Sequence, residues 1–253
     1  MAGHSKWANI KHKKARSDEK KGKLFTKIAK EIIIAARDGG GDPDSNPRLK
    51  MLIQKAKGVN MPNENIQRAI KRGTGEIEGG NIEEITYEGY GPGGVALMLS
   101  IVTDNRNRTA ADIRHLFSKH GGNLGEAGCV SWMFRKKGLL TLNADELGMD
   151  AEEFMLAAIE AGAEDVREDS GVLEVITSPE DFSEVKDQLE KQGIKFDSAQ
   201  VAMIPETVVD VTDLETAKKV LKLVDILEDH DDVQEVYANF SIPEDIMEKV
   251  QLQ

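Results

Sequence analysis

The sequence has a single cysteine, Cys129, among its 253 residues. One cysteine can form neither an internal disulfide nor a cysteine-based zinc site, which is the pattern of proteins from a reducing compartment such as the cytoplasm. Aromatic residues make up only 5% of the chain, so extended stacking surfaces for nucleic-acid bases are not expected. The five histidines show no spacing typical of a metal site, and we expect no metal and no cofactor.

The chain also lacks the run of ~20 apolar residues that a membrane-spanning helix needs. The most apolar run, residues 93–102, is too short and predicts a strand. The lysine-rich N-terminus has no apolar segment of the kind found in secretory signals. No Ser-His-Asp, Cys-His or paired-carboxylate arrangement follows from the spacing. We therefore expect a cytoplasmic protein that is not an enzyme, with no membrane partner and no small-molecule substrate.

Charge, by contrast, is abundant and unevenly divided. Residues 1–75 hold eighteen Lys and Arg against seven Asp and Glu, a formal balance of +11. Residues 76–253 hold fifteen against thirty-eight, a balance of −23, so the total of −12 conceals the division. Neutralisation of phosphates by Lys and Arg releases condensed counterions and drives binding to nucleic acid. The N-terminal block therefore predicts a nucleic-acid-binding end on an acidic body.

Three helices with one shared apolar face are predicted in the N-terminal block, and together they make a small bundle. The first covers residues 17–38, and its lysines form a stripe opposite its apolar face. Few acidic residues of the same helix are placed to neutralise the charge of this stripe. The second begins at Asn46 and Pro47, a cap followed by proline at the first helical position. The third lies between Pro62 and Gly73.

After a linker at 76–81, the hydrophobic pattern changes to period two, typical of mixed α/β structure. Residues 138–204 predict the order strand, helix, strand, strand, helix, strand of a ferredoxin-like domain. A separate strand is predicted at 129–135. Helix 213–229 and strand 233–240 have no domain of their own, so we expect them to complete the segment before the inserted run.

These elements predict a multi-domain α and α+β protein, with an N-terminal three-helix bundle plus two ferredoxin-like α+β domains, one inserted in the other. The basic arm and the bundle are assigned to residues 1–79. The discontinuous α+β domain takes residues 80–135 plus 207–245, and the inserted βαββαβ domain takes residues 136–206.

The candidate nucleic-acid contacts are Trp7 of the arm and cations of the arm, of the first and third helices and of one later loop. They are Lys6, Trp7, Lys11, Lys13, Lys14, Arg16, Lys20, Lys23, Lys27, Lys30, Arg68, Lys71, Arg72, Arg106 and Arg108. Trp7 could stack on an exposed base or pack on the helical domain. Arg106 and Arg108 lie where the chain enters a predicted helix, 108–120, whose N-terminus attracts anions. The alternative for these two arginines is pairing with neighbouring acids at a seam between domains.

Two further features have a structural interpretation. The glycine-rich loop at 88–94 lies between two predicted strands, which favours a tight hairpin with positive-φ glycines over a nucleotide site. The acids between Asp225 and Asp232 do not have the spacing of a calcium loop, and we interpret them as a solvated acidic face.

Several long motifs are spread over nearly the whole chain. They include Met-Ala-Gly-His-Ser-Lys-Trp-Ala-Asn-Ile at 1–10, Gly-Lys-Leu-Phe-Thr-Lys at 22–27, Tyr-Glu-Gly-Tyr-Gly-Pro-Gly-Gly at 87–94, Asp-Asn-Arg-Asn-Arg-Thr at 104–109 and Asp-Asp-Val-Gln-Glu-Val-Tyr at 231–237. These motifs resemble those of the YebC/PmpR family, whose mitochondrial relative is a translational activator of cytochrome c oxidase.

The resemblance implies a helical N-terminal domain, two α+β domains with one inserted in the other, no catalytic residues and no cofactor. Family members are usually described as probable DNA-binding transcriptional regulators. A second role in the family is translational, with ribosome association, binding to ribosomal RNA and relief of stalling. The basic arm matches the nucleic-acid-contacting region of the family. The residues alone do not separate DNA from RNA, although a basic arm without a clear base-reading helix slightly favours structured RNA.

The basic arm generates a first prediction. Replacing Lys11, Lys13 and Lys14 with Ala should lower the slope of log K against log[salt] by roughly two to three units, because three phosphate contacts are lost. Titrations of labelled nucleic acid at several salt concentrations measure the slope. A slope equal to that of the wild type would remove the arm from the binding mechanism.

Overall fold

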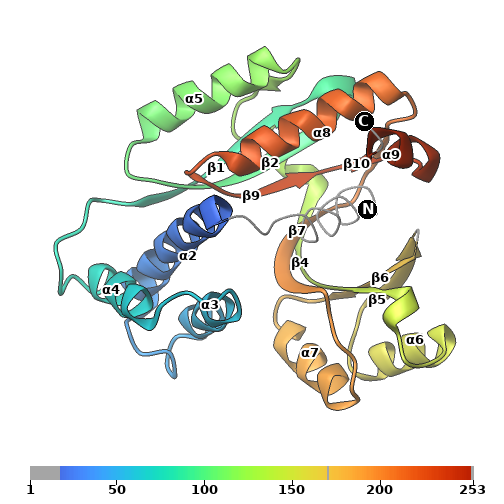
Figure 1. Cartoon of the computed structure of the whole chain (residues 1–253), viewed down its shortest axis with the longest axis horizontal. Helices are drawn as coiled ribbons and strands as arrows, with labels where there is room; N and C mark the ends of the chain where they lie inside the picture. The colour runs from blue at the N-terminus through green and yellow to red at the C-terminus, as the bar shows by residue number, and fades with distance from the viewer. Residues whose placement is uncertain (1–17, 170, 252–253) are drawn as a thin grey trace.

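The computed structural model describes residues 18–169 and 171–251, without the side chains of residues 18–20, 169 and 251. It has a helical N-terminal region followed by sheet-containing units, which confirms the predicted multi-domain α and α+β class (Figure 1). Among the described residues, no helix is both long enough and apolar enough to cross a membrane.

The N-terminal region packs α2 (Asp18–Gly39), α3 (Pro47–Gly58) and α4 (Asn63–Gly73) around one hydrophobic cluster. The predicted start of α3 is confirmed, because the Asn46 side chain accepts a hydrogen bond from the Leu49 amide at 3.0 Å. At its C-terminal end α4 approaches α2 closely. A Cβ atom at Gly73 would collide with the Ile33 carbonyl oxygen, so only glycine allows this contact.

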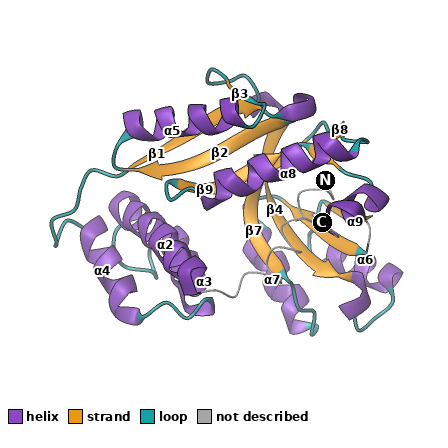
Figure 2. Ribbon diagram, turned by 45° about the horizontal axis from the view of Figure 1, so that its top comes forward, coloured by secondary structure: helices purple, strands orange, loops and turns teal. Residues whose placement is uncertain are grey.

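The middle unit is a sheet of order β3-β1-β2-β9, covered on one face by α5 and α8 (Figure 2). Its strands are β1 (Glu83–Tyr90), β2 (Ala96–Thr103), β3 (Asn123–Leu124) and β9 (Val233–Ala238), and its helices are α5 (Arg106–Lys119) and α8 (Leu214–Asp229). Alternate residues of β2, namely Leu97, Leu99 and Ile101, point into the core beneath both helices. The β1–β2 connection is the predicted hairpin, in which Gly93 and Gly94 have φ of 71° and 75°.

The second large sheet has the order β5-β6-β4-β7, and α6 and α7 share one core with it. Its elements are β4 (Phe134–Asn143), α6 (Ala151–Glu160), β5 (Asp165–Asp169), β6 (Val172–Thr177), α7 (Phe182–Lys191) and β7 (Ser198–Pro205). The chain order βαββαβ and this strand order are those of the ferredoxin-like arrangement. The limits assigned above to the discontinuous and inserted domains stay a prediction.

One predicted strand is wrong. Residues 129–135 and 138–143 do not form two strands, because β4 runs without interruption from Phe134 to Asn143 after the 3₁₀ turn η2 (Ser131–Met133). The first half of β4 pairs with β7, so it belongs to the second sheet. The middle sheet has instead the two-residue strand β3, which is too short to produce a period-two signal.

The remaining elements are short. They are the 3₁₀ turns η1 (Pro92–Gly94) and η3 (Ala144–Glu146), the strands β8 (Val209–Asp210) and β10 (Phe240–Ser241), which pair in parallel, and the C-terminal helix α9 (Glu244–Gln251). Ile246 and Met247 of α9 are buried in the core of the middle unit. The sequence interpretation did not include β8, β10 or α9.

Candidate nucleic-acid interface

The lysine stripe of α2 faces the turn between α8 and β9. Lys23 Nζ lies 2.9 Å from the Asp229 carboxylate. Lys27 Nζ donates to the Glu228 carbonyl oxygen at 2.6 Å. Helix α2 is amphipathic, so burying its apolar face against α3 and α4 leaves the lysines on the side that meets the middle unit. The stripe is therefore compensated by residues about two hundred positions away.

The centre of this contact is the carboxylate of Asp232, whose side chain is 7% exposed. Its Oδ1 accepts from Lys30 Nζ at 2.7 Å, and its Oδ2 accepts from Arg108 at 2.9 Å and from the Thr109 hydroxyl at 2.8 Å. Burial by itself would raise the pKa of Asp232, but these hydrogen bonds hold that pKa well below the ordinary value. Asp232 is thus an ionised, buried acceptor that joins α2, α5 and the turn before β9, which corrects its interpretation as part of a solvated face.

Other pairs extend the same seam. Lys55 Nζ of α3 lies 3.2 Å from Glu31 and 3.8 Å from Glu235 of β9. Burial would lower the pKa of Lys55, but the two carboxylates raise it above the ordinary value. Arg48 lies 3.0 Å from Glu84 of β1. The basic N-terminal block is consequently held to the acidic body by ion pairs as well as by the chain connection.

Lys27 is the exception in this set, because the pKa of its amine is lowered. Burial is the largest cause and outweighs the nearby carboxylates, of which Glu235 is the most effective. Lys27 is therefore positioned as a partly buried donor to a main-chain carbonyl oxygen.

These contacts decide how the predicted site residues are placed. Lys23, Lys27, Lys30 and Arg108 all have protein acceptors in this structure. For Arg108 the alternative of pairing with acids at the seam is the one observed, and Asp104 is its second partner at 2.9 Å. Contact of these four cations with nucleic acid would compete with these protein acceptors, and it stays a prediction. The predicted contacts of the arm, Lys6, Trp7, Lys11, Lys13, Lys14 and Arg16, and the Lys20 side chain lie outside the described residues.

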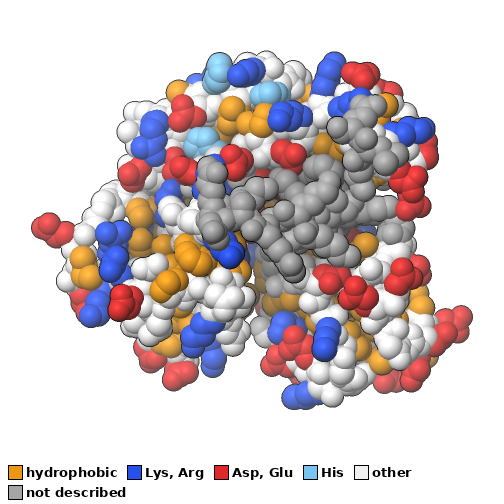
Figure 3. Space-filling model, in the orientation of Figure 1, with side chains coloured by type: hydrophobic (Ala, Val, Ile, Leu, Met, Phe, Trp, Pro, Cys, Tyr) orange, Lys and Arg blue, Asp and Glu red, His pale blue; other side chains and the backbone are white. Residues whose placement is uncertain are grey.

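The α4 cations are placed differently. Ile66, Ala69 and Ile70 are buried, which turns Arg68, Lys71 and Arg72 outward at the C-terminal end of the helix. Within residues 18–169 and 171–251, no ion pair joins these three side chains to an acid. Figure 3 shows Lys and Arg side chains gathered on the side of the molecule where Figure 1 places α4. This end of α4 is an exposed cationic surface.

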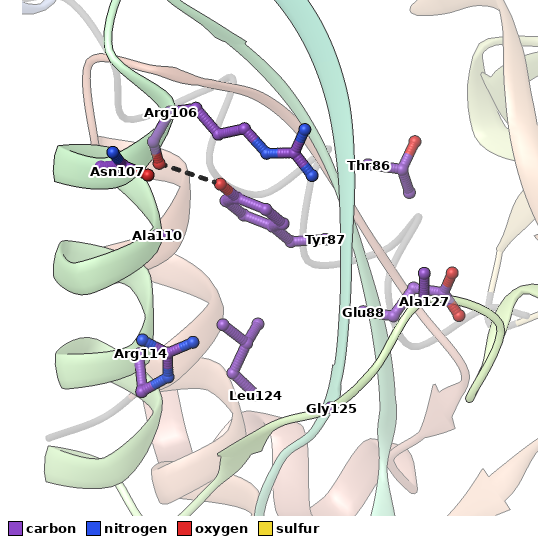
Figure 4. Close-up of a pocket in the computed structure, with 10 residues that line it drawn as sticks. All are labelled: Thr86, Tyr87, Glu88, Arg106, Asn107, Ala110, Arg114, Leu124, Gly125 and Ala127. Atoms are coloured by element: carbon purple, nitrogen blue, oxygen red, sulfur yellow. Dashed lines mark hydrogen bonds between the residues drawn. The ribbon is translucent and has the colours of Figure 1, made fainter.

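Arg106 lies at the first position of α5, two residues before the predicted helix start. Asn105 is the N-cap and its side chain accepts from the Arg108 amide at 3.0 Å, whereas the sequence interpretation had begun the helix at residue 108. Arg106 and Arg114 both line a pocket beside β1, together with Tyr87 (Figure 4). The sequence analysis missed Arg114, although its spacing of eight residues from Arg106 is about two helical turns and was the available signal.

The described residues contain no group of three or more His, Cys, Asp or Glu side chains that could hold a metal ion.

Two segments of the chain match one protein family. Residues 5–76 match the domain described as the TACO1/YebC protein N-terminal domain, and residues 82–240 match the TACO1/YebC second and third domain. The chain belongs to the TACO1/YebC family. The family resemblance found in the sequence motifs is thereby confirmed.

Relatives of known description cover the whole chain. A probable transcriptional regulatory protein from Halothermothrix orenii is 65% identical over 250 residues, which are 99% of this chain and 99% of that protein. A protein of the same description from Moorella thermoacetica is 61% identical over 253 residues, 100% of both chains. A crystal structure of a conserved hypothetical protein from Aquifex aeolicus has a TM-score of 0.80 at 53% identity, covering 90% of this chain and 93% of that one.

The Asp232 contact generates a second prediction. Asp232→Asn should lower the free energy of unfolding by about 2–3 kcal/mol, because it places a neutral amide beside two cations and leaves them without their buried partner. Asp229→Asn is the matched control, since the Asp229 side chain is 66% exposed and its pair with Lys23 should contribute less than about 1 kcal/mol. Denaturant titrations measure both differences.

The stability difference between wild type and Asp232→Asn should depend on pH. Because the pKa of Asp232 is lower in the folded chain, its carboxylate stabilises the fold above the unfolded pKa and loses this effect as the pH falls. The difference in stability between wild type and Asp232→Asn should therefore shrink from about pH 5 to about pH 3. A difference that stays constant over this range would contradict the assignment of Asp232 as the ionised partner.

Proposed function

We propose that this member of the TACO1/YebC family is a nucleic-acid-binding regulator, and specifically a DNA-binding transcriptional regulator that works in the cytoplasm. The proposal is carried by the exposed Arg68, Lys71 and Arg72 on α4, which lie at the basic end of an otherwise acidic protein. The description of its relatives as probable transcriptional regulatory proteins supports the same function. The single cysteine suits a reducing compartment.

The mode of binding proposed for α4 is phosphate contact. Lys and Arg contacts to phosphate fix the position and orientation of a protein on nucleic acid without reading its sequence. Besides its cations, the exposed face of α4 carries Asn63, Glu64 and Gln67, which lie in the first half of the helix, whereas Arg68, Lys71 and Arg72 lie in the second half. The charge of −23 over residues 76–253 would repel a second turn of duplex, so we infer a short contact through the basic end.

The second candidate is a ribosome-associated translation factor that binds ribosomal RNA and relieves stalling. The observation that favours it is the gathering of Arg68, Lys71 and Arg72 in the second half of α4, because a phosphate-contacting surface suits the irregular backbone of folded RNA. Both candidates place the nucleic acid against the basic end and require no catalytic residue, in accordance with the expectation that the protein is not an enzyme.

A third prediction tests the α4 surface. The combined variant Arg68→Ala, Lys71→Ala, Arg72→Ala should lower the slope of log K against log[salt] for duplex DNA by roughly two to three units, since each lost phosphate contact removes about 0.9. Because all three side chains are exposed, the unfolding free energy should change little. The matched control removes the same charge from exposed positions on the body, with Lys119→Ala, Lys191→Ala and Lys195→Ala. Equal slopes for the two triple variants would refute a specific role for α4.

Crosslinking in living cells, followed by sequencing of the bound DNA and of the bound RNA, separates the two candidates. A transcriptional regulator should be enriched at promoters, with the enrichment reduced in the α4 variant. Enrichment on ribosomal RNA with none at promoters would reject the transcriptional proposal in favour of the translational one.

A further inference from the structure

A pocket of about 280 Å³ lies between α5, β1 and the loop that follows β3. Its walls include Tyr87 and Glu88 from β1, Arg106, Ala110 and Arg114 from α5, and Leu124 from β3 (Figure 4). Strand β3 pairs with β1 only at Gly89 and Tyr90, so the rest of this edge of β1 is left beside the pocket.

The two arginines give the pocket its charge. Arg106 and Arg114 are eight residues apart on α5, which corresponds to ~12 Å along the helix axis. Both side chains are exposed, and within the part of the chain that the structure describes neither forms an ion pair. Arg108, between them in sequence, is turned to the seam and pairs with Asp104 and Asp232. The pocket is thus cationic although residues 76–253 have a formal charge of −23. The reason is that the nearby acids Asp104 and Asp232 pair with Arg108 and leave Arg106 and Arg114 without an acidic partner among the described residues.

The one carboxylate in the wall is already satisfied. Glu88 Oε1 accepts from the Gly128 amide, and Oε2 accepts from the amides of Val130 and Ser131, each at 2.8 Å. Burial would raise the pKa of Glu88, but these amides lower it, so it stays ionised without pairing with either arginine. The pocket consequently keeps two cations available for an anionic ligand.

The floor of the pocket provides an aromatic surface. The Tyr87 hydroxyl donates to the Arg106 carbonyl oxygen at 3.2 Å, which fixes the ring against the first turn of α5. Figure 4 shows this ring between Arg106 and Leu124. Ala110 projects only a methyl group between the two arginines, so the space over the ring is not filled by α5 itself. An aromatic face flanked by two arginines is the combination that binds a base and its phosphates in single strands.

We propose that this pocket, formed by Tyr87, Arg106 and Arg114, is a second nucleic-acid site that takes a single-stranded segment. The two arginines contact phosphates on either side of one nucleotide, and its unpaired base or its sugar lies against the Tyr87 ring. A base inside a duplex is stacked on its neighbours and cannot reach the ring, so the pocket selects single strands. The inference rests on the proposed function, and it assigns to the middle unit a contact that the basic end does not supply.

The test uses the full-length protein and three fluorescein-labelled probes, namely a short single-stranded RNA, the DNA of the same sequence, and its blunt duplex. Combining Arg106→Ala with Arg114→Ala should lower the salt slope for the single strands by roughly 1.4, since each single-strand phosphate contact contributes about 0.7. Tyr87→Ala should weaken single-strand binding about fivefold or more through the loss of stacking. Tyr87→Phe should retain it, because the ring remains.

Two controls keep these outcomes separate from folding and from the α4 surface. Lys119→Ala removes an exposed cation of the same helix that does not line the pocket, and it should leave the single-strand slope unchanged. The two arginine substitutions are at exposed positions, so thermal unfolding of that variant should match the wild type even if Tyr87→Ala is destabilised. Duplex binding should depend on α4 and not on the pocket variants.

The binding results also distinguish failure of the pocket inference from failure of the proposed function. If the wild type binds the probes but the double arginine variant has the same single-strand slope as Lys119→Ala, the pocket inference is overturned while the proposed function stands. If the wild type binds none of the probes, both fail. A polyglutamate peptide that displaces the single strand as well as unlabelled oligonucleotide does would reassign the pocket to acidic peptides and also overturn the inference.

Discussion

The buried carboxylate of Asp232 is the interaction on which the arrangement of this protein depends. It accepts hydrogen bonds from Lys30 of α2 and from Arg108 and Thr109 of α5, so one side chain joins the helical region to the middle unit. Removing a charge from water is costly, and the cost is offset only when its partners are close and its lone pairs are satisfied. The short distances around Asp232 meet that condition. Other pairs along the seam are more exposed and contribute less individually.

This seam divides the cations of the basic end into two groups. Lysines of α2 contact the acidic turn before β9, whereas Arg68, Lys71 and Arg72 of α4 face outward. The same division recurs on α5, where Arg108 turns to Asp232 while Arg106 and Arg114 line the pocket. A cation that neutralises an internal carboxylate is not available to a phosphate. The carboxylates of the acidic body therefore determine which cations have an acidic partner and which stay exposed among the described residues.

Much of the architecture follows from local features of the sequence. Three features depend on residues close together in the chain. They are the start of helix α3 at Asn46-Pro47, the hairpin of the glycine-rich loop and the βαββαβ order. The wrong strand predictions occur where strand formation depends on pairing with a segment far away in the sequence. Residues 134–137 extend β4 because they pair with β7, about seventy positions later, and not because of their own pattern. Strand β3 has only two residues, so no periodicity could predict it.

The sequence by itself determined the family, the fold class, the helical N-terminal bundle and the presence of a strongly basic end, since motifs, periodicity, caps and charge are all written in adjacent residues. Only the tertiary structure decided which charges are neutralised. Lys30 and Asp232 are 202 positions apart, and nothing in the sequence near either residue indicates the other. Pairing and burial arise when separate segments pack together, which is why the lysine stripe of α2 faces a seam with the middle unit. Contact of these lysines with nucleic acid stays a prediction. The same packing brought Tyr87 and Arg114, from different elements, to one pocket.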